Sequence, residues 1–357
     1  MIFYLVTYTF LSILSLFKYF KYFFFLIIFL LIIIIGFRYE VGGDWYSYIG
    51  LLEEFDGTFV DRFGYFFKDY LFQALLQVLS KFSHSYVILN LFSSIIFLTG
   101  MAFYISLFEN KILNLTLAFP IYIMIIGMGF TKQSLALGLI FYSLYFMHKN
   151  KQTGSIALVL VASFIHIGSF IILFIQLPYL LYTQKKVFNN FLYFIFGICV
   201  IFIFYIFYHN HFFFLATTKH LINYLDVNKT VFTDSNILGF FSRALIISSL
   251  CFLIINKAIT NHYPNIYNFY WFSSMVAIVI VLLGLFLSPV LSDRLLYYFA
   301  FIQIFFIGNI HLVIENNKKL IIFKLISILS GFTILLIWLC FSHNSHAWIP
   351  YNNMLLL

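Results

Sequence analysis

Residues 22–48 read YFFFLIIFLLIIIIGFRYEVGGDWYSY, and this stretch decides the fold class of the chain. Residues 22–37 form an apolar run, and a helix that crosses a membrane needs about 20 predominantly apolar residues. Arg38, Glu40, a glycine pair and Asp44 follow immediately. Such an abrupt change to charged and turn-forming residues is typical of a transmembrane helix and the loop at its exit.

The composition extends this interpretation to all 357 residues. Hydrophobic residues make up 63% of the chain and charged residues 9%, with a mean hydropathy of +1.02. Soluble domains contain about 45–50% apolar and about 25% charged residues. A cytosolic enzyme, a nucleic-acid binder and a secreted disulfide scaffold are therefore excluded. The formal net charge of +8 fits the excess of Lys and Arg that cytoplasmic loops of membrane proteins carry.

We predict an all-α polytopic membrane protein with one integral membrane domain over residues 1–357. The chain offers about 11–12 transmembrane helices, one of them broken. The apolar runs lie at residues 2–17, 22–37, 85–108, 112–130, 131–147, 155–182, 188–208, 240–256, 267–288, 294–314 and 320–341. Two long connections, at about 38–84 and 209–239, hold most of the Asp and Glu. We expect these two connections to be functional extracytoplasmic loops.

The cysteines and the N-terminus add no further chemistry. Cys199, Cys251 and Cys340 lie in separate apolar runs without metal-type spacing, so we predict small core residues with no redox role. The N-terminus lacks the basic region and cleavage site of a signal peptide, so the first run is expected to remain as a span. We predict no cofactor and no metal.

Lysines in the short turns predict the orientation, because such residues face the cytoplasm. They are Lys18, Lys21, Lys111, Lys149, Lys151, Lys185, Lys186, Lys257, Lys318, Lys319 and Lys324. The N-terminus, both long loops and the C-terminal tail then lie outside. A single crossing over residues 155–182 would place Lys185 outside, so we predict a broken element that returns near His166-Ile167-Gly168. The alternative is one long tilted helix.

The arginines follow the opposite rule. Arg38, Arg62, Arg243 and Arg294 all lie on the predicted outer side, which positive-inside bias disfavours. Arginine is preferred over lysine where a planar fork must bind carboxylate or phosphate. Ionisable groups at helix ends in membrane proteins indicate functional sites. Snorkelling at the membrane interface is the alternative explanation.

The first outer motif is residues 38–48, at the exit of the second predicted span. Its glycine pair permits a sharp turn, and Asp44 is placed as the N-cap of a helix that starts at Trp45. Trp45, Ile49 and Leu52 recur at helical spacing, as in a helix that lies at the membrane interface. Asp44 could cap this helix, or it could bind a sugar hydroxyl or accept a proton.

Three further motifs lie on the same predicted side. Lys132, within residues 130–136, is placed either to meet a phosphate or to anchor a helix. His166, within residues 164–169, is either a hydrogen-bonded core residue or a proton acceptor near neutral pH. In residues 288–298, Pro289 is expected to end one span and Ser292 or Asp293 to cap the next. Arg294 would then stand in a first helical turn, which binds anions readily.

The four motifs, in this order, resemble the EpsG / Wzy-like polysaccharide (O-antigen) polymerase family over essentially the whole chain. The family's Arg-Tyr-x-Val-Gly-x-Asp-x-x-x-Tyr element corresponds to residues 38–48, and its Arg-Gln-x-x-Ala element to residues 132–136. A Phe-His pair, an Arg that leads an aromatic helix, and Pro350-Tyr351 also correspond. Lys132 in place of Arg, and one additional residue before His166, depart from the pattern.

The resemblance implies a multi-pass glycosyltransferase of the bacterial inner membrane that acts in polysaccharide biosynthesis. It implies that repeat units on undecaprenyl diphosphate are joined at the periplasmic face into a surface polysaccharide, such as the O-antigen of lipopolysaccharide. Donor and acceptor would both be lipid-linked glycans, and a chain-length regulator could be a partner.

The residues suit this chemistry. A lipid diphosphate leaving group needs cations, and we expect Arg38, Lys132, Arg243 and Arg294 to bind it. The acceptor hydroxyl needs a base, for which His166 is the first candidate and Asp44 or Glu40 the second. Tyr48, Gln133 and Tyr298 are expected to bind substrate.

Three other functions stay open at this point. A C-type glycosyltransferase would use a polyprenyl-phosphate sugar, with Glu40 and Asp44 as base or metal ligands. A flippase for lipid-linked oligosaccharides would carry no chemistry. An O-antigen ligase shares the architecture. A nucleotide-driven pump and a zincin-type protease are excluded because the chain has neither G-x-x-x-x-G-K-[ST] nor H-E-x-x-H.

Overall fold

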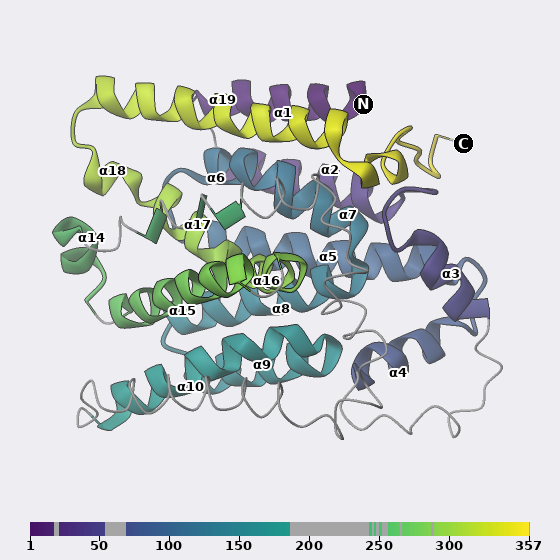
Figure 1. Cartoon of the computed structure of the whole chain (residues 1–357), viewed down its shortest axis with the longest axis horizontal. Coiled ribbons are helices and arrows are strands. Elements are labelled where there is room, and N and C mark those ends of the chain that lie inside the picture. The colour runs from purple at the N-terminus through teal and green to yellow at the C-terminus, as the bar shows by residue number, and fades with distance from the viewer. Residues whose placement is uncertain are drawn as a thin grey trace.

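The computed structural model describes residues 1–17, 21–53, 69–185, 243–244, 246–247, 250–251, 256–264, 266–286 and 289–356. These residues form helices joined by short turns (Figure 1). The elements are α1 (Ile2–Ser15), α2 (Lys21–Gly36), α3 (Trp45–Glu53), α4 (Tyr70–Leu79), α5 (Ser85–Ile105), α6 (Lys111–Ala118), η1 (Phe119–Ile126), α7 (Gly127–Gly129), α8 (Thr131–His148), α9 (Gln152–Ile165), η2 (Ile167–Ser169), α10 (Phe170–Lys185), α14 (Lys257–His262), α15 (Tyr267–Phe286), α16 (Pro289–Leu296), η4 (Tyr297–Phe299), α17 (Ala300–Gly308), α18 (Ile310–Val313), α19 (Asn317–Phe341) and η5 (His343–Ala347).

Within the described residues, most of the predicted apolar runs coincide with helices to within a few residues, while the runs at 155–182 and 294–314 are each divided among several helices. Among the described residues, three helical segments are long and apolar enough to cross a membrane: Ser85–Ile105, Lys111–Gly129 and Asn317–Phe341. Shorter apolar helices accompany them, including Ile2–Ser15 and Tyr22–Gly36. The described residues therefore agree with an all-α membrane protein, while the number of about 11–12 transmembrane helices stays a prediction. The predicted spans 188–208 and most of 240–256, and the loop 209–239, lie outside the described residues.

The segment α6–η1–α7 forms the buried centre of the bundle. Its π-helical part, η1, has every residue buried. A π-helix leaves backbone groups free of the α-helical pattern, and here the Trp348 indole N–H donates to the Met124 carbonyl oxygen at 3.0 Å. A ring from the C-terminal tail thus satisfies the backbone in the middle of the fold.

Helices α5 and α8 approach each other closely because two glycines meet between them. A Cβ atom on Gly100 would stand 2.3 Å from the carbonyl oxygen of Gly138. Small residues permit such backbone contact between membrane helices, where packing drives association. Ser93 on α5 and Ser134 on α8 add a hydrogen bond of 2.8 Å. The close packing of α5 against α8 fixes the position of Thr131 and Lys132 at the start of α8.

The element after α8 is a hairpin that turns at His166, as predicted. Helix α9 ends at Ile165, His166 is extended, and α10 begins at Phe170. Ser155 lies on α9 and Gln176 on α10, and their side chains are hydrogen-bonded, although His166 stands between them in sequence. Helix α10 therefore runs back along α9, and the alternative of one long tilted helix is wrong.

The C-terminal tail closes the end of the bundle where α3 and α4 lie (Figure 1). The Gly42 amide donates to the Ala347 carbonyl at 2.7 Å, and the Tyr39 amide to Asn352 at 3.1 Å. Gly42 has a φ of +114°, and a Cβ there would stand 2.0 Å from the Met128 carbonyl oxygen. The loop after α2 is thus held between the tail and α7.

The two ends of the bundle carry different residues. We call one the α3 end, with α3, α4 and both chain termini, and the other the α14 end, with α14 and α18 (Figure 1). Lys149, in the turn after α8, belongs to the α14 end, since its neighbour His148 contacts Tyr263 just after α14. The predicted assignment of these ends to the outside and the cytoplasm stays a prediction.

Candidate functional site

The four motifs of the sequence meet at the α3 end. They bring together six side chains, which we call the outer cluster: Asp44, Asp69, Lys132, His166, Arg294 and Tyr298. Direct contacts form two pairs, Lys132 with Asp69 and Tyr298 with His166. The charges of Lys132 and Arg294 act on both Asp44 and His166. Residues from all four motifs therefore lie at the same end of the structure.

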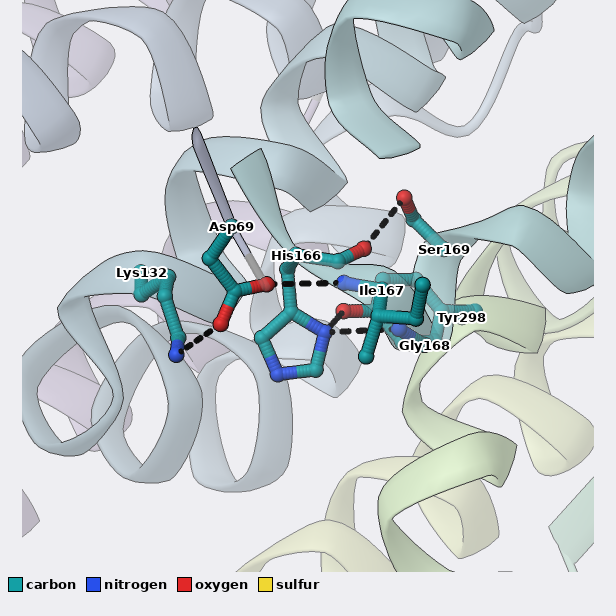
Figure 2. Close-up of polar contacts among 7 residues, drawn as sticks. All are labelled: Asp69, Lys132, His166, Ile167, Gly168, Ser169 and Tyr298. Atoms are coloured by element: carbon teal, nitrogen blue, oxygen red, sulfur yellow. Dashed lines mark hydrogen bonds and ion pairs between the residues drawn. The ribbon is translucent and has the colours of Figure 1, made fainter. Parts of the chain in front are cut away.

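Asp69 connects two elements of the cluster through its carboxylate (Figure 2). One carboxylate oxygen, Oδ2, lies 2.6 Å from Lys132 Nζ, and the other, Oδ1, accepts the Ile167 amide at 3.0 Å. Asp69 has a left-handed backbone (φ 47°) directly before α4. One side chain thus ties the start of α8 to the hairpin turn.

His166 stands in that turn with its ring turned toward η4 (Figure 2). Its Nδ1 accepts the Gly168 amide at 3.1 Å and lies 2.7 Å from the Tyr298 hydroxyl. A Cβ on Gly168 would stand 3.0 Å from both rings. Glycine at this position therefore lets His166 and Tyr298 touch.

Asp44 occupies the predicted place before α3, which begins at Trp45 as expected. Its carbonyl oxygen accepts the Tyr48 amide at 3.0 Å, as in a helix N-cap. Burial raises the pKa of the Asp44 carboxyl, while Arg294, Lys132 and a hydrogen bond from Tyr48 oppose this rise. A carboxylate that is partly desolvated between two cations is a typical acid–base group.

Arg294 is exposed at the α3 end, and its guanidinium lies 6.0 Å from the centre of the Phe130 ring. The Gln133 side chain donates to the Arg294 carbonyl oxygen at 3.0 Å. The second and fourth motifs are thus joined through α8 and α16.

The predicted first-turn position of Arg294 is wrong. Helix α16 begins at Pro289 and ends at Leu296, so Arg294 stands in its last turn. The cause is Pro289, since proline fits the first turn of a helix, where its missing N–H costs nothing. The N-terminus of α16 therefore does not direct its backbone amides toward an anion at Arg294.

Two other predicted arginines hold protein oxygens. Arg38 is 1% exposed and donates to the carbonyls of Ile35 (2.8 Å) and Val41 (3.2 Å) and to the Thr131 hydroxyl (2.9 Å). Arg243 forms a two-pronged ion pair with Asp293. Both guanidinium groups therefore support the framework around the cluster, and Arg62 lies outside the described residues.

The remaining predicted residues take different places. Tyr48 is buried in α3 with its ring against Phe72, and Gln133 and Tyr298 bind protein groups as described above. Glu40 is exposed with a left-handed backbone (φ 53°). Within the described residues, no group of three His, Cys, Asp or Glu side chains is placed to hold a metal ion.

Sequence reasoning missed Asp69. Its signal was local and weak, since an Asp directly before the apolar run of residues 70–79 is a common helix start. Its partner Lys132 is 63 residues away in sequence, so no spacing rule could connect them.

One of three comparisons with known proteins gives a match, and it covers nearly the whole chain. The family model described as the EpsG family matches residues 21–353. This range contains all six residues of the outer cluster. No curated protein and no solved structure matches the chain.

Proposed function

This chain belongs to the EpsG family, a group of glycosyltransferase-like polysaccharide polymerases of the membrane, and on this premise we propose its reaction. The chain joins repeat units carried on undecaprenyl diphosphate, by glycosyl transfer at the outer face of the bacterial inner membrane. One lipid-linked glycan is the donor and the terminal sugar of another is the acceptor. The product is a surface polysaccharide.

One observation carries the proposal: the outer cluster pairs two cations with a carboxylate whose burial raises its pKa. Lys132 and Arg294 both act on Asp44. A transferase with a diphosphate leaving group needs these two kinds of group side by side, because anionic charge grows on the leaving group while the acceptor loses a proton. A transporter needs no such pairing.

Lys132 and Arg294 are the proposed diphosphate ligands. An ammonium group has three N–H donors, and the Lys132 side chain, 28% exposed, uses one on Asp69. Arg294 is exposed beside it. Arg38 and Arg243, whose forks hold protein oxygens, are proposed to position the loop before α3 and helix α16.

Asp44 is the proposed acceptor-side group. Its ordinary carboxyl pKa is raised by burial, which makes a carboxylate a stronger base near neutral pH. The Tyr48 hydroxyl orients it. Gln133 and Tyr298 are proposed to hold Arg294 and His166 in place.

The test uses the purified chain in lipid nanodiscs with lipid-linked repeat units extracted from a strain that lacks it. We expect longer lipid-linked glycans and release of undecaprenyl diphosphate, with no added metal or nucleotide. Release of a monophosphate, or activity abolished by EDTA, would instead identify a C-type glycosyltransferase. Movement of intact units across vesicles without any bond formed would identify a flippase.

A further inference from the structure

The hydrogen bonds of His166 fix which of its nitrogens carries the proton. The Gly168 amide donates to Nδ1 at 3.1 Å. A backbone amide is always a donor, so Nδ1 must offer a lone pair, and a neutral ring then carries its proton on Nε2. The Tyr298 hydroxyl, 2.7 Å from the same atom, consequently donates to Nδ1 as well.

The other nitrogen, Nε2, points away from these contacts (Figure 2). In the part of the chain that the structure describes, no residue hydrogen-bonds to it. The positive charges of Lys132 and Arg294 reach the ring. An N–H donor is thus presented beside the two proposed diphosphate ligands.

The surroundings also keep the ring neutral. Burial, together with the charges of Lys132 and Arg294, lowers the pKa of His166 to about 4, and only Asp69 acts in the opposite direction. Such a group is a weak base at pH 7. The ring's lone pair is on Nδ1, and this atom already accepts hydrogen bonds from the Gly168 amide and the Tyr298 hydroxyl.

We propose that His166 acts as a neutral hydrogen-bond donor to the lipid diphosphate, through its Nε2–H, and that Asp44 is the base. This inference rests on the function proposed above. The acceptor oxygen forms a bond to the anomeric carbon of the donor sugar. The bond from that carbon to the diphosphate oxygen breaks, and its electron pair leaves with the diphosphate. The acceptor proton passes to Asp44, while His166 keeps its own proton.

Two substitutions of similar size separate a donor from a base. His166→Gln carries an amide N–H to about the position of Nε2–H but cannot accept a proton. His166→Asn keeps an oxygen near the place of Nδ1 for the Gly168 amide but has no donor at the outer position. His166→Ala removes both groups.

Turnover is measured with purified variants and lipid-linked repeat units extracted from a strain that lacks the chain. We expect His166→Gln to remain within about tenfold of the native chain, and His166→Asn and His166→Ala to lose about 10²–10³-fold, the usual cost of one oxyanion donor. Equal, severe loss in Gln and Asn, with both proteins folded, would overturn the proposal. Native turnover in His166→Ala would also overturn it.

The pH profile decides the matter if His166→Gln fails to accumulate. The charged and titratable groups that face His166 are Lys132, Asp69, Arg294 and Tyr298. With a donor role, the acid limb of the rate in His166→Asn matches that of the native chain, because Asp44 sets it. Loss of that limb in His166→Asn would identify His166 as the base. Absence of any turnover by the native chain would refute the proposed function itself, which no variant result can do.

Discussion

Two histidines of this chain each contact a tyrosine, at opposite ends of the bundle. His166 Nδ1 lies 2.7 Å from the Tyr298 hydroxyl at the α3 end, and His148 Nε2 lies 2.8 Å from the Tyr270 hydroxyl at the α14 end. The two contacts are nearly equal in length. Their surroundings differ, and the difference separates a candidate reaction centre from a packing contact.

Around His148, the neighbours are aromatic. Its ring packs against Tyr104, Phe108 and Tyr263 at centroid distances of 6.0, 5.8 and 6.1 Å. The Tyr270 hydroxyl also forms a hydrogen bond of 2.5 Å with the Tyr104 hydroxyl. These hydroxyls satisfy one another inside the protein, as buried polar groups require.

Around His166, the neighbours are charged. Asp69 and Lys132 form an ion pair beside it, and Arg294 acts on it from α16. Charged side chains that gather around a titratable group are a common feature of functional sites. We therefore propose that the same His–Tyr contact is structural at the α14 end and functional at the α3 end.

The largest effect that would sharpen this comparison is expected from Asp44→Asn. Loss of a general base costs about 10²–10⁴-fold in turnover, while Asn caps a helix as well as Asp, so the start of α3 should survive. Because burial raises the pKa of Asp44, the native rate should fall on acidification at a pH above the ordinary carboxyl range. Rates across pH with extracted lipid-linked units measure both effects. An unchanged rate in folded Asp44→Asn would remove Asp44 as the base.

The next effect concerns the loop that carries Asp44. Gly42→Ala places a Cβ 2.0 Å from the Met128 carbonyl oxygen at a φ of +114°, and should cost about 3 kcal/mol of stability. Thermal unfolding in detergent measures it. Gly50→Ala is the control, since nothing lies within 4 Å of its Cβ and alanine favours α3 by about 0.5–1 kcal/mol. Equal stability of the two variants would contradict the tail-held loop.

A smaller effect is expected from Arg294→Lys. The charge stays, but the planar fork that binds two phosphate oxygens is lost, so turnover should fall about tenfold with the fold intact. Steady-state rates against donor concentration, with membrane levels by immunoblot, measure this. Lys149→Arg, at the α14 end, should leave turnover unchanged because only charge matters there. A silent Arg294→Lys would make Arg294 an interfacial anchor.

The smallest effect on activity is expected from His148→Phe. Phenylalanine fits the aromatic surroundings but leaves the Tyr270 hydroxyl without one partner. Stability should therefore fall by about 1 kcal/mol, while the turnover rate should stay unchanged. Thermal unfolding and the same turnover assay measure the two quantities. A severe loss of turnover in stable His148→Phe would break the distinction between the two ends.

Much of the fold could be predicted from the sequence because hydropathy and basic turns act locally. The hairpin at His166 followed from the lysines at both ends of one apolar run. Helix α3 followed from Asp44 and the helical spacing after it. These features depend on neighbours in the chain, so a single sequence contains them.

The site was predicted only in part, because its bonds connect distant residues. Arg38 was predicted as a phosphate ligand, yet its partners are two backbone carbonyls and Thr131. Asp69 was missed because its partner is on another helix. Arg294 was placed in the wrong helical turn, since Pro289 can follow one helix or begin the next.

The surface-polysaccharide ladder of a deletion strain tests the central claim most directly. The strain is complemented with the native chain, His148→Phe or Asp44→Asn, with membrane levels matched by immunoblot. We expect full-length ladders from the native chain and from His148→Phe. Asp44→Asn should give a single repeat unit on its anchor. A full-length ladder from Asp44→Asn, or the loss of even the single unit, would contradict a polymerase centred on the outer cluster.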